Sequence, residues 1–310
     1  MRKLLILSDC GERAPELTDE FDVVALSADA DEKARLREIA DAEVVVGEPS
    51  LAELSAAEKL RWVQMTWAGA DRYLRGGFPR GVLLTTASGA FGETIAEHAL
   101  AMLFSLCRRL PAYQKAGKWA DLGSEKRIAG GTALIFGCGN LGTEIAKRLR
   151  ALGVRTIGVC RDARRPRTHF NALTTLRCAE AFLPEADFIL CALPSNEETD
   201  GYFGEETLSL CKDDAVLINV GRGSLIDLQC LTSLLNAGKF FGVGLDVTEP
   251  EPLPPEHPLW KTPNVILTPH VAGVSFGHLP ETEEKIWAIC RENIQNYIAG
   301  RPLRNAVNVP

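Results

Sequence analysis

The chain has 310 residues, of which 46% are hydrophobic and 24% are charged, a composition typical of a folded globular protein that excludes a disordered or collagen-like chain. Its length exceeds the usual size of one hydrophobic core, so two domains are the starting expectation. Because 41 acidic residues outnumber 34 Lys and Arg to give a net charge of −7, nucleic acid is not an expected partner.

Short apolar runs alternate with helical patterns in the first third of the chain. We expect strands at residues 3–7, 23–26, 43–46, 62–65 and 82–85. The order strand, helix, strand predicts a parallel sheet. From Phe91 to Leu106 apolar residues recur at intervals of three and four, which predicts a long helix that ends before Pro111 and links two domains.

A second alternating series follows, and its six expected strands suit one complete doubly wound sheet. These strands are residues 133–136, 156–160, 188–191, 216–220, 243–247 and 265–267. A last helix is expected at residues 281–299, before Gly300, and should pack on the first domain.

The sequence thus predicts an α/β protein of two Rossmann-like or flavodoxin-like doubly wound parallel-sheet domains, with an active-site cleft between them. Residues 1–98 and 277–310 are expected to form a discontinuous substrate-binding domain. Residues 99–276 are expected to form the dinucleotide-binding domain.

Nine cysteines, among them Cys10, are scattered without any CxxC pair. The spacings of a structural zinc site are absent, so no metal is expected. The apolar run at residues 4–7 is too short for a signal peptide, and no stretch suggests a membrane span. We therefore expect a reducing, cytoplasmic setting and no membrane partner.

A glycine motif, Gly-Cys-Gly-Asn-Leu-Gly at residues 137–142, follows an apolar strand and opens a helix. In such a motif Gly137 permits the tight turn, Gly139 lets the backbone approach a pyrophosphate, and Gly142 allows the helix to pack against the strand. The amino end of the helix favours the anion. An ordinary Gly-rich turn is the alternative, but the strand-turn-helix context favours a dinucleotide site.

The carboxylate that normally binds the adenosine ribose is missing at the end of the next strand. The chain has Cys160 and Arg161 there, followed by Arg164 and Arg165. Arg161 with Arg164 or Arg165 could bind a 2′-phosphate bidentately, so NADPH is predicted as the preferred cofactor over NADH. The alternative is that the arginines form a solvated loop and that Asp162 binds the ribose.

Three polar residues follow predicted strands, where ligands bind in open α/β sheets. Arg222 lies between two glycines, Glu251 lies in the proline-rich segment 249–258, and His270 follows the strand at 265–267. A guanidinium binds a planar carboxylate by two parallel bonds, and a neighbouring carboxylate favours a protonated imidazole. With a nicotinamide hydride donor, these groups match the reduction of a 2-oxo acid.

In this interpretation Arg222 holds the substrate carboxylate and polarises the oxo group, while His270 protonates the nascent alkoxide. Glu251 orients His270 and stabilises its protonated form. Glu249 competes for the carboxylate role because it also flanks Pro250. His98, on the long helix, is expected to be a packed or capping histidine.

The chain resembles the D-isomer-specific 2-hydroxyacid dehydrogenase family, and within it the glyoxylate/hydroxypyruvate reductase-like branch. The resemblance covers nearly the whole chain and rests on residues 66–71, 91–98, 137–142, 193–195, 218–227, 244–254 and 268–270. It implies that the catalytic residues are Arg222, Glu251 and His270, and it favours Glu251 over Glu249.

The resemblance also implies a substrate-binding turn at Trp67, Ala68 and Gly69, whose backbone holds the substrate carboxylate. Trp67 stands where similar proteins often have a small residue, which would alter the pocket. Further cofactor contacts are implied for Asn140, Leu141, Leu193, Pro194, Val220 and Asp246, although Asp246 is also expected to bond its own loop. A homodimer built through the cofactor domain and a small 2-oxo or 2-hydroxy acid substrate are implied as well.

Other functions remain open on this scaffold. Formate dehydrogenases of similar fold place Gln beside the histidine, so Glu251 argues against formate oxidation. Glu251 does not argue against phosphite oxidation, which stays an alternative. A dinucleotide-sensing protein similar to C-terminal-binding corepressors is the non-catalytic alternative.

Overall fold

The computed structural model describes residues 2–8, 20–27, 29–273, 276 and 278–309. The chain divides into two units, Met1–Phe91 with Val274–Pro310, and Gly92–Gly273. The boundaries expected from the sequence lie slightly further along the chain. The difference arises because helix α4 (Gly92–Cys107) packs over its whole length on the sheet of the second unit.

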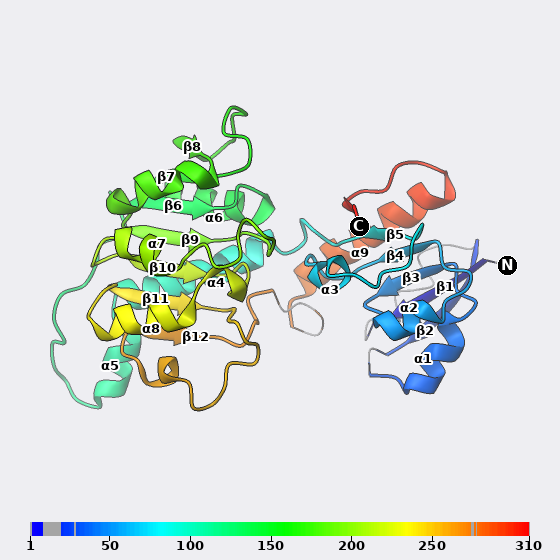
Figure 1. Cartoon of the computed structure of the whole chain (residues 1–310), viewed down its shortest axis with the longest axis horizontal. Coiled ribbons are helices and arrows are strands. Elements are labelled where there is room, and N and C mark those ends of the chain that lie inside the picture. The colour runs from blue at the N-terminus through cyan, green and yellow to red at the C-terminus, as the bar shows by residue number, and fades with distance from the viewer. Residues whose placement is uncertain (1, 9–19, 28, 274–275, 277, 310) are drawn as a thin grey trace. The chain divides into compact units, whose positions relative to one another are not determined.

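The first unit is built on a six-stranded sheet in the order β13-β5-β4-β3-β1-β2 (Figure 1). Its strands are β1 (Arg2–Leu7), β2 (Phe21–Leu26), β3 (Val44–Gly47), β4 (Trp62–Gln64), β5 (Leu83–Thr85) and β13 (Ala306–Val307). Its helices are α1 (Glu32–Ile39), α2 (Leu51–Ser55), α3 (Asp71–Leu74) and α9 (Pro280–Ile298). The five predicted strands pair in parallel in a flavodoxin-like order. Strand β13 was not predicted, and it pairs antiparallel with β5.

A buried polar network ties α9 to this sheet. Asn293 of α9 donates from Nδ2 to Gln64 Oε1 at 2.7 Å and to the Arg304 carbonyl at 3.0 Å, and its Oδ1 accepts from the Arg304 amide at 2.7 Å. Thr85 Oγ1 donates to the same Gln64 oxygen at 2.7 Å and accepts from Trp62 Nε1 at 2.9 Å. Because Gln64, Thr85 and Asn293 are all buried, each needs these partners.

The second unit contains a seven-stranded parallel sheet in the order β12-β11-β10-β9-β6-β7-β8 (Figure 1). Its strands are β6 (Thr132–Phe136), β7 (Arg155–Val159), β8 (Ala172–Thr174), β9 (Phe188–Cys191), β10 (Val216–Asn219), β11 (Gly242–Leu245) and β12 (Val265–Leu267). The central order is that of a dinucleotide-binding Rossmann sheet, and the predicted fold class is confirmed. Six of these strands were predicted, and the edge strand β8 was not.

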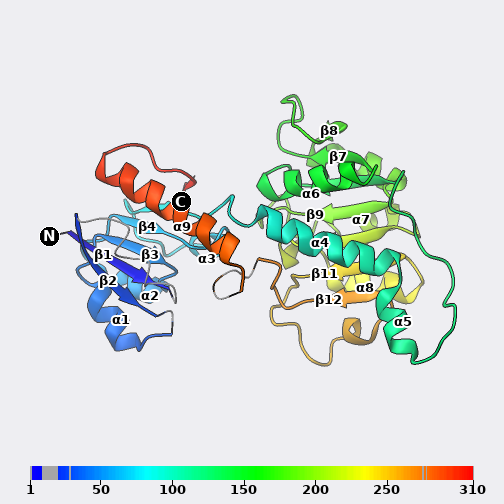
Figure 2. The same cartoon turned by 180° about the vertical axis from the view of Figure 1, so that it is seen from behind.

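Helices cover both faces of the second sheet. Figure 2 shows α4 and α6 (Asn140–Ala151) across one face, and Figure 1 shows α7 (Glu205–Leu210) and α8 (Leu228–Asn236) across the other. The remaining helical segments are α5 (Leu110–Ala116), η2 (Leu176–Glu185), η3 (Gly223–Leu225) and η4 (Pro258–Lys261). No helix of the described residues is long and apolar enough to cross a bilayer.

Helix α4 approaches the sheet closely because β11 offers glycines beneath it. A Cβ at Gly244 would lie 2.9 Å from Met102 Sδ, and one at Gly242 would lie 2.9 Å from Leu106 Cδ2. This helix ends before Pro111, as expected, but the proline is not what ends it. Instead α4 ends at Cys107, and Pro111 lies in the first turn of α5, where its missing N–H costs nothing.

The cysteines in the described part of the chain are all free, and Cys10 lies outside it. Among the same residues, no group of three or more His, Cys, Asp or Glu side chains could hold a metal ion.

Replacing Asn293 by Leu should lower the free energy of unfolding by about 2–4 kcal/mol, because Gln64 and the Arg304 backbone lose buried partners. Chemical denaturation followed by circular dichroism measures this change. Gln295→Leu, at an exposed position of the same helix, is the matched control and should change stability by less than about 0.5 kcal/mol. Equal effects of the two substitutions would contradict the role assigned to the network.

Candidate active site

The glycine loop between β6 and α6 has the shape that a dinucleotide needs. Gly137 has φ 105°, and a Cβ there would lie 2.7 Å from the Ala192 carbonyl oxygen. A Cβ at Gly142 would lie 1.8 Å from the Gly137 oxygen, whereas a Cβ at Gly139 would meet nothing within 4 Å. Two glycines therefore hold the loop tight, and the third leaves open space in front of the α6 amino terminus, which fits a pyrophosphate.

Other residues expected at the cofactor lie at the same edge of the sheet. Leu193 and Pro194 follow β9, and Val220 follows β10, which is the neighbour of β9. A Cβ at Gly221 would lie 2.7 Å from the Leu193 oxygen, so the two loops are in close contact. Asn140 and Leu141 form the first turn of α6.

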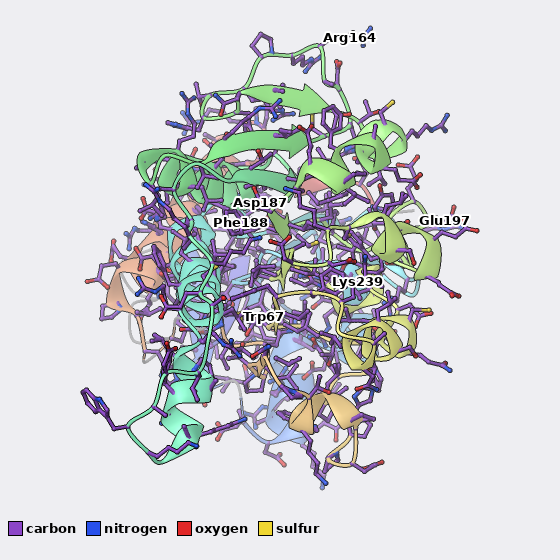
Figure 3. The ribbon with its side chains drawn as sticks, turned by 90° about the vertical axis from the view of Figure 1, so that its left-hand side faces the viewer. Trp67, Arg164, Asp187, Phe188, Glu197 and Lys239 are labelled. Carbon is purple, nitrogen blue, oxygen red and sulfur yellow. The ribbon has the colours of Figure 1, made fainter. Side chains whose placement is uncertain are left out.

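The loop after β7 presents its arginines to solvent. Arg161 is exposed, and Arg164 extends from the tip of the loop with 91% of its side chain exposed (Figure 3). Asp162 accepts from Arg164 Nε at 2.9 Å and lies 3.5 Å from Arg165 Nε. The bonds from Arg164 hold the pKa of Asp162 below its usual value. Cys160 is buried.

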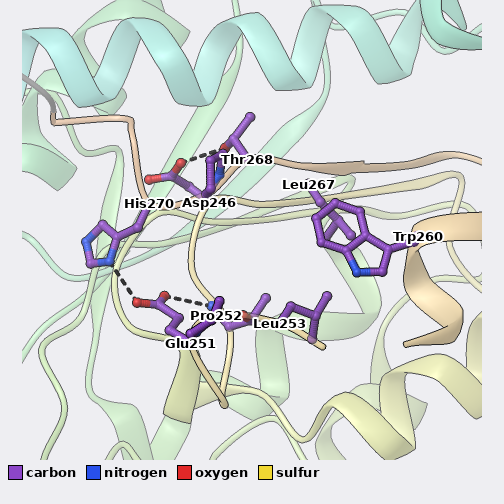
Figure 4. Close-up of a pocket in the computed structure, with 10 residues that line it drawn as sticks. Asp246, Glu251, Pro252, Leu253, Trp260, Leu267, Thr268 and His270 are labelled. Atoms are coloured by element: carbon purple, nitrogen blue, oxygen red, sulfur yellow. Dashed lines mark hydrogen bonds and ion pairs between the residues drawn. The ribbon is translucent and has the colours of Figure 1, made fainter. Parts of the chain in front are cut away.

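His270 and Glu251 form the most direct pair among the predicted catalytic residues. His270 Nδ1 lies 3.0 Å from Glu251 Oε2, and Glu251 Oε1 accepts from the Thr248 amide at 3.0 Å (Figure 4). Both side chains are partly exposed, at 51% and 39%. Within the described part of the chain His270 Nε2 has no hydrogen-bond partner, so this nitrogen can face a ligand.

Asp246, at the end of β11, shapes the turn that carries His270. Its carbonyl accepts from the His270 amide at 2.8 Å, and its carboxylate accepts from the amides of Val271 at 2.9 Å and Ala272 at 3.0 Å. His270 has φ 55°, a left-handed conformation that a non-glycine residue adopts only when its surroundings hold it. Asp246 is only 2% exposed. These bonds fit the expected loop-bonding role, while a cofactor contact by Asp246 stays a prediction.

Two threonines and one histidine complete this arrangement. Thr268 Oγ1 donates to Asp246 Oδ1 at 2.5 Å (Figure 4) and lies 3.0 Å from His98 Nε2 of α4. His98 was expected to be packed or capping, but its partner could not be identified from the sequence. Thr248 and Thr268 were not named as site residues, although both lie beside predicted strand ends and within segments that carry the family resemblance.

Arg222 follows β10, next to β11 in the sheet. Asn219 Nδ2 donates to the Arg222 carbonyl at 2.9 Å, and the Arg222 guanidinium donates to the Gly221 carbonyl at 2.8 Å. A Cβ at Gly223 would lie 2.0 Å from the Thr248 carbonyl carbon. The loop of Arg222 therefore packs against Thr248, the residue whose amide holds Glu251.

A cavity of about 400 Å³ borders the His270–Glu251 pair. Asp246 and Thr268 also line it, and Leu253, Trp260 and Leu267 form an apolar wall (Figure 4). The predicted substrate turn, Trp67–Gly69, belongs to the first unit, where it follows β4 and exposes Trp67 by 55%.

Gly139→Ala should leave the thermal midpoint unchanged and weaken binding of NADPH at least about tenfold, because its methyl group would occupy space meant for the pyrophosphate. Gly142→Ala is the contrasting variant and should lower both stability and cofactor affinity, since its Cβ would meet backbone. Thermal unfolding and fluorescence titration measure these effects. Unchanged affinity in Gly139→Ala would contradict the assignment of this loop.

Comparison with known proteins agrees with this geometry. Residues 100–272 match the family described as D-isomer specific 2-hydroxyacid dehydrogenase, NAD binding domain. A glyoxylate reductase of Korarchaeum cryptofilum is 32% identical, over 93% of this chain and 90% of that protein.

Two solved structures are similar over almost the whole chain. One, from Aeromonas salmonicida, is described as a D-isomer specific 2-hydroxyacid dehydrogenase family protein; it has a TM-score of 0.87 and 34% identity, covering 99% of both chains. An NADPH-dependent glyoxylate/hydroxypyruvate reductase of Sinorhizobium meliloti, in complex with NADP and sulfate, has a TM-score of 0.86 and 26% identity over 99% of this chain and 98% of that one. The chain belongs to the D-isomer specific 2-hydroxyacid dehydrogenase family and is a nicotinamide-dependent oxidoreductase.

Proposed function

We propose that this protein reduces a small 2-oxo acid of the glyoxylate or hydroxypyruvate type to the D-2-hydroxy acid, with NADPH as the preferred cofactor. The observation that carries the proposal is the His270 Nδ1–Glu251 Oε2 contact of 3.0 Å, which leaves Nε2 available to a ligand. The relatives named as glyoxylate reductase and glyoxylate/hydroxypyruvate reductase support this substrate class.

In the proposed mechanism each residue has a separate task. Arg222, together with the backbone of Ala68 and Gly69, holds the substrate carboxylate, and the guanidinium also polarises the oxo group. The bound nicotinamide cofactor supplies the hydride that becomes the new hydrogen on C2. His270 donates the proton from Nε2 to the former oxo oxygen, and Glu251 stabilises the protonated imidazole and keeps it oriented.

The loop after β7 supports the preference for NADPH. Arg161 is exposed there. Arg164 bonds to Asp162 through Nε and Nη2 but is 91% exposed, so the remaining donors of its guanidinium are available to a 2′-phosphate. The carboxylate of Asp162 accepts bonds from Arg164, which leaves it less available to a ribose hydroxyl. The NADP complex of the Sinorhizobium meliloti relative points the same way.

A homodimer and a cytoplasmic setting also belong to this proposal. Both stay predictions, the first from the family resemblance and the second from the free cysteines.

His270→Ala should lower kcat by about 10²–10⁴, because a positioned general acid contributes that much, with little change in the dissociation constant of NADPH. Glu251→Gln should lower kcat in the same direction, but less. Glu249→Gln is the matched control two residues away and should leave kcat unchanged. Equal losses in the two glutamine variants, or normal turnover in His270→Ala, would remove these residues from their proposed roles.

The activity assay follows NADPH oxidation at 340 nm with glyoxylate, hydroxypyruvate, pyruvate and phenylpyruvate. Turnover with at least one of these acids is expected. Tight NADPH binding without turnover of any 2-oxo acid would favour a dinucleotide sensor. Reduction of NADP⁺ in the presence of phosphite would favour a phosphite dehydrogenase.

Arg161→Ala and Arg164→Ala should each lower kcat/KM for NADPH at least about tenfold, since each removes a charge-assisted bond to phosphate, and should leave kcat/KM for NADH nearly unchanged. Arg155→Ala, at the opposite end of β7, is the control and should affect neither cofactor. A wild-type protein that prefers NADH would contradict this assignment.

A further inference from the structure

The substrate turn of the first unit leaves two successive amides available. Within the described residues, the amides of Ala68 and Gly69 donate to no acceptor, and Ala68 is exposed. The Trp67 carbonyl, by contrast, accepts from the Ala87 amide at 2.9 Å. Two successive amides without partners can bind a carboxylate only if the surrounding backbone keeps them pointing the same way.

One acidic side chain holds the residues just before these amides. Glu48 Oε1 accepts from the Thr66 amide at 2.8 Å and from the Trp67 amide at 3.0 Å. Thr66 Oγ1 lies 2.9 Å from Oε2 of the same carboxylate and 3.1 Å from Oε1. The carboxylate therefore binds the two amides that precede the available pair.

Glu48 is itself held in place at both sides. It follows Gly47, where φ is 127° and a Cβ would lie 2.4 Å from the Leu7 carbonyl oxygen, so the chain leaves β3 in close contact with β1. On its other side, the Pro49 carbonyl accepts from the hydroxyl of Tyr73 at 2.7 Å. Because Tyr73 lies in α3, directly after the substrate turn, the turn is anchored at its beginning by Glu48 and at its end by Tyr73.

We propose that Glu48 is a positioning residue for the substrate carboxylate, acting through the backbone of Trp67–Gly69. The inference rests on the proposed function of that turn. An ionised carboxylate is an acceptor only, so it binds the amides of Thr66 and Trp67 and directs the next two amides away from itself. No feature of the sequence had singled out this residue.

Fold stability does not by itself explain a carboxylate at this position. Burial raises the pKa of Glu48 above its ordinary value, against the opposing effect of its bonds to Thr66 and Trp67. A folded-state pKa above the unfolded one means that the charged form disfavours folding near neutral pH. The charged and titratable neighbours are Arg72 and Tyr73 of α3 and Cys290 of α9, of which only Arg72 favours the anion.

Two substitutions of Glu48 by side chains of similar length separate the effect of its hydrogen-bond acceptors from the effect of its packing. Glu48→Met removes the acceptor oxygens, and Glu48→Gln keeps one of them. In Glu48→Met we expect KM for the 2-oxo acid to rise at least about tenfold, with KM for NADPH and kcat nearly unchanged, because ground-state binding is lost. In Glu48→Gln KM should stay within about threefold of the wild type.

Glu53→Ala is the control for a merely structural effect. Glu53 lies nearby in the sequence and pairs with Arg35 at 2.6 Å, and it caps α2 through the Ser50 amide. This variant should lower the thermal midpoint and leave KM for the 2-oxo acid unchanged. Equal KM values in the wild type, Glu48→Met and Glu48→Gln would overturn the proposal.

Hydrogen exchange of the peptide containing residues 66–70 gives a readout that needs no activity. Exchange should be faster in Glu48→Met than in the wild type and remain close to wild type in Glu53→Ala. If the wild type reduced no 2-oxo acid, the proposed function would fail. Faster exchange in Glu48→Met would still support the inference that Glu48 anchors the backbone of residues 66–70. Unchanged exchange in Glu48→Met would overturn the anchoring itself.

Discussion

The carboxylate of Asp246 holds the turn from Thr268 to Ala272 in a shape that the chain would not adopt alone. The carboxylate accepts hydrogen bonds from two successive amides and from the Thr268 hydroxyl. The backbone carbonyl of Asp246 accepts a hydrogen bond from the His270 amide. These bonds stabilise the left-handed backbone at His270. Without them the imidazole would have no fixed direction toward Glu251, and the contact proposed to serve catalysis would depend on two exposed side chains with no fixed orientation.

Helix α4 and the loops that follow neighbouring strands of the second unit pack against this turn and the residues around it. Asp246 directly follows β11, whose glycines allow α4 to pack closely, and α4 brings His98 to Thr268. On the neighbouring strand, the loop of Arg222 packs on Thr248, whose amide holds Glu251. The site is therefore assembled from the carboxyl ends of adjacent parallel strands, where a rigid sheet can place loops from distant parts of the sequence.

Much of this arrangement could be predicted because it follows from local patterns. Strands of a parallel sheet are mostly apolar, so eleven of the strands could be predicted from the sequence. The glycine motif could be predicted as well, because each of its glycines stands where a side chain would clash with the backbone or with a bound pyrophosphate. The two missed strands, β8 and β13, lie at sheet edges and contain only two successive apolar residues each, which is too short an apolar run to indicate a strand. Pro111 was misread because proline is unfavourable inside a helix but favourable in its first turn.

The partners of polar side chains were the least predictable feature. Glu48 and Thr66 are 18 residues apart, and Asp246 and Thr268 are 22 apart, so their pairing appears only when the strands are in register. The sequence did predict that Glu251 and His270 lie together, because each follows a strand and the resemblance names both. It could not show that Glu251 is held by Thr248 or that His270 depends on Asp246.

A crystal structure of the protein with NADP⁺ and oxamate, an analogue of a 2-oxo acid, tests the central claim most directly. We expect the amide carbonyl oxygen of oxamate within hydrogen-bond distance of His270 Nε2, and its carboxylate against the Arg222 guanidinium, with the contact between His270 and Glu251 kept. Oxamate bound away from His270, or an imidazole turned from Glu251 in that complex, would contradict the claim.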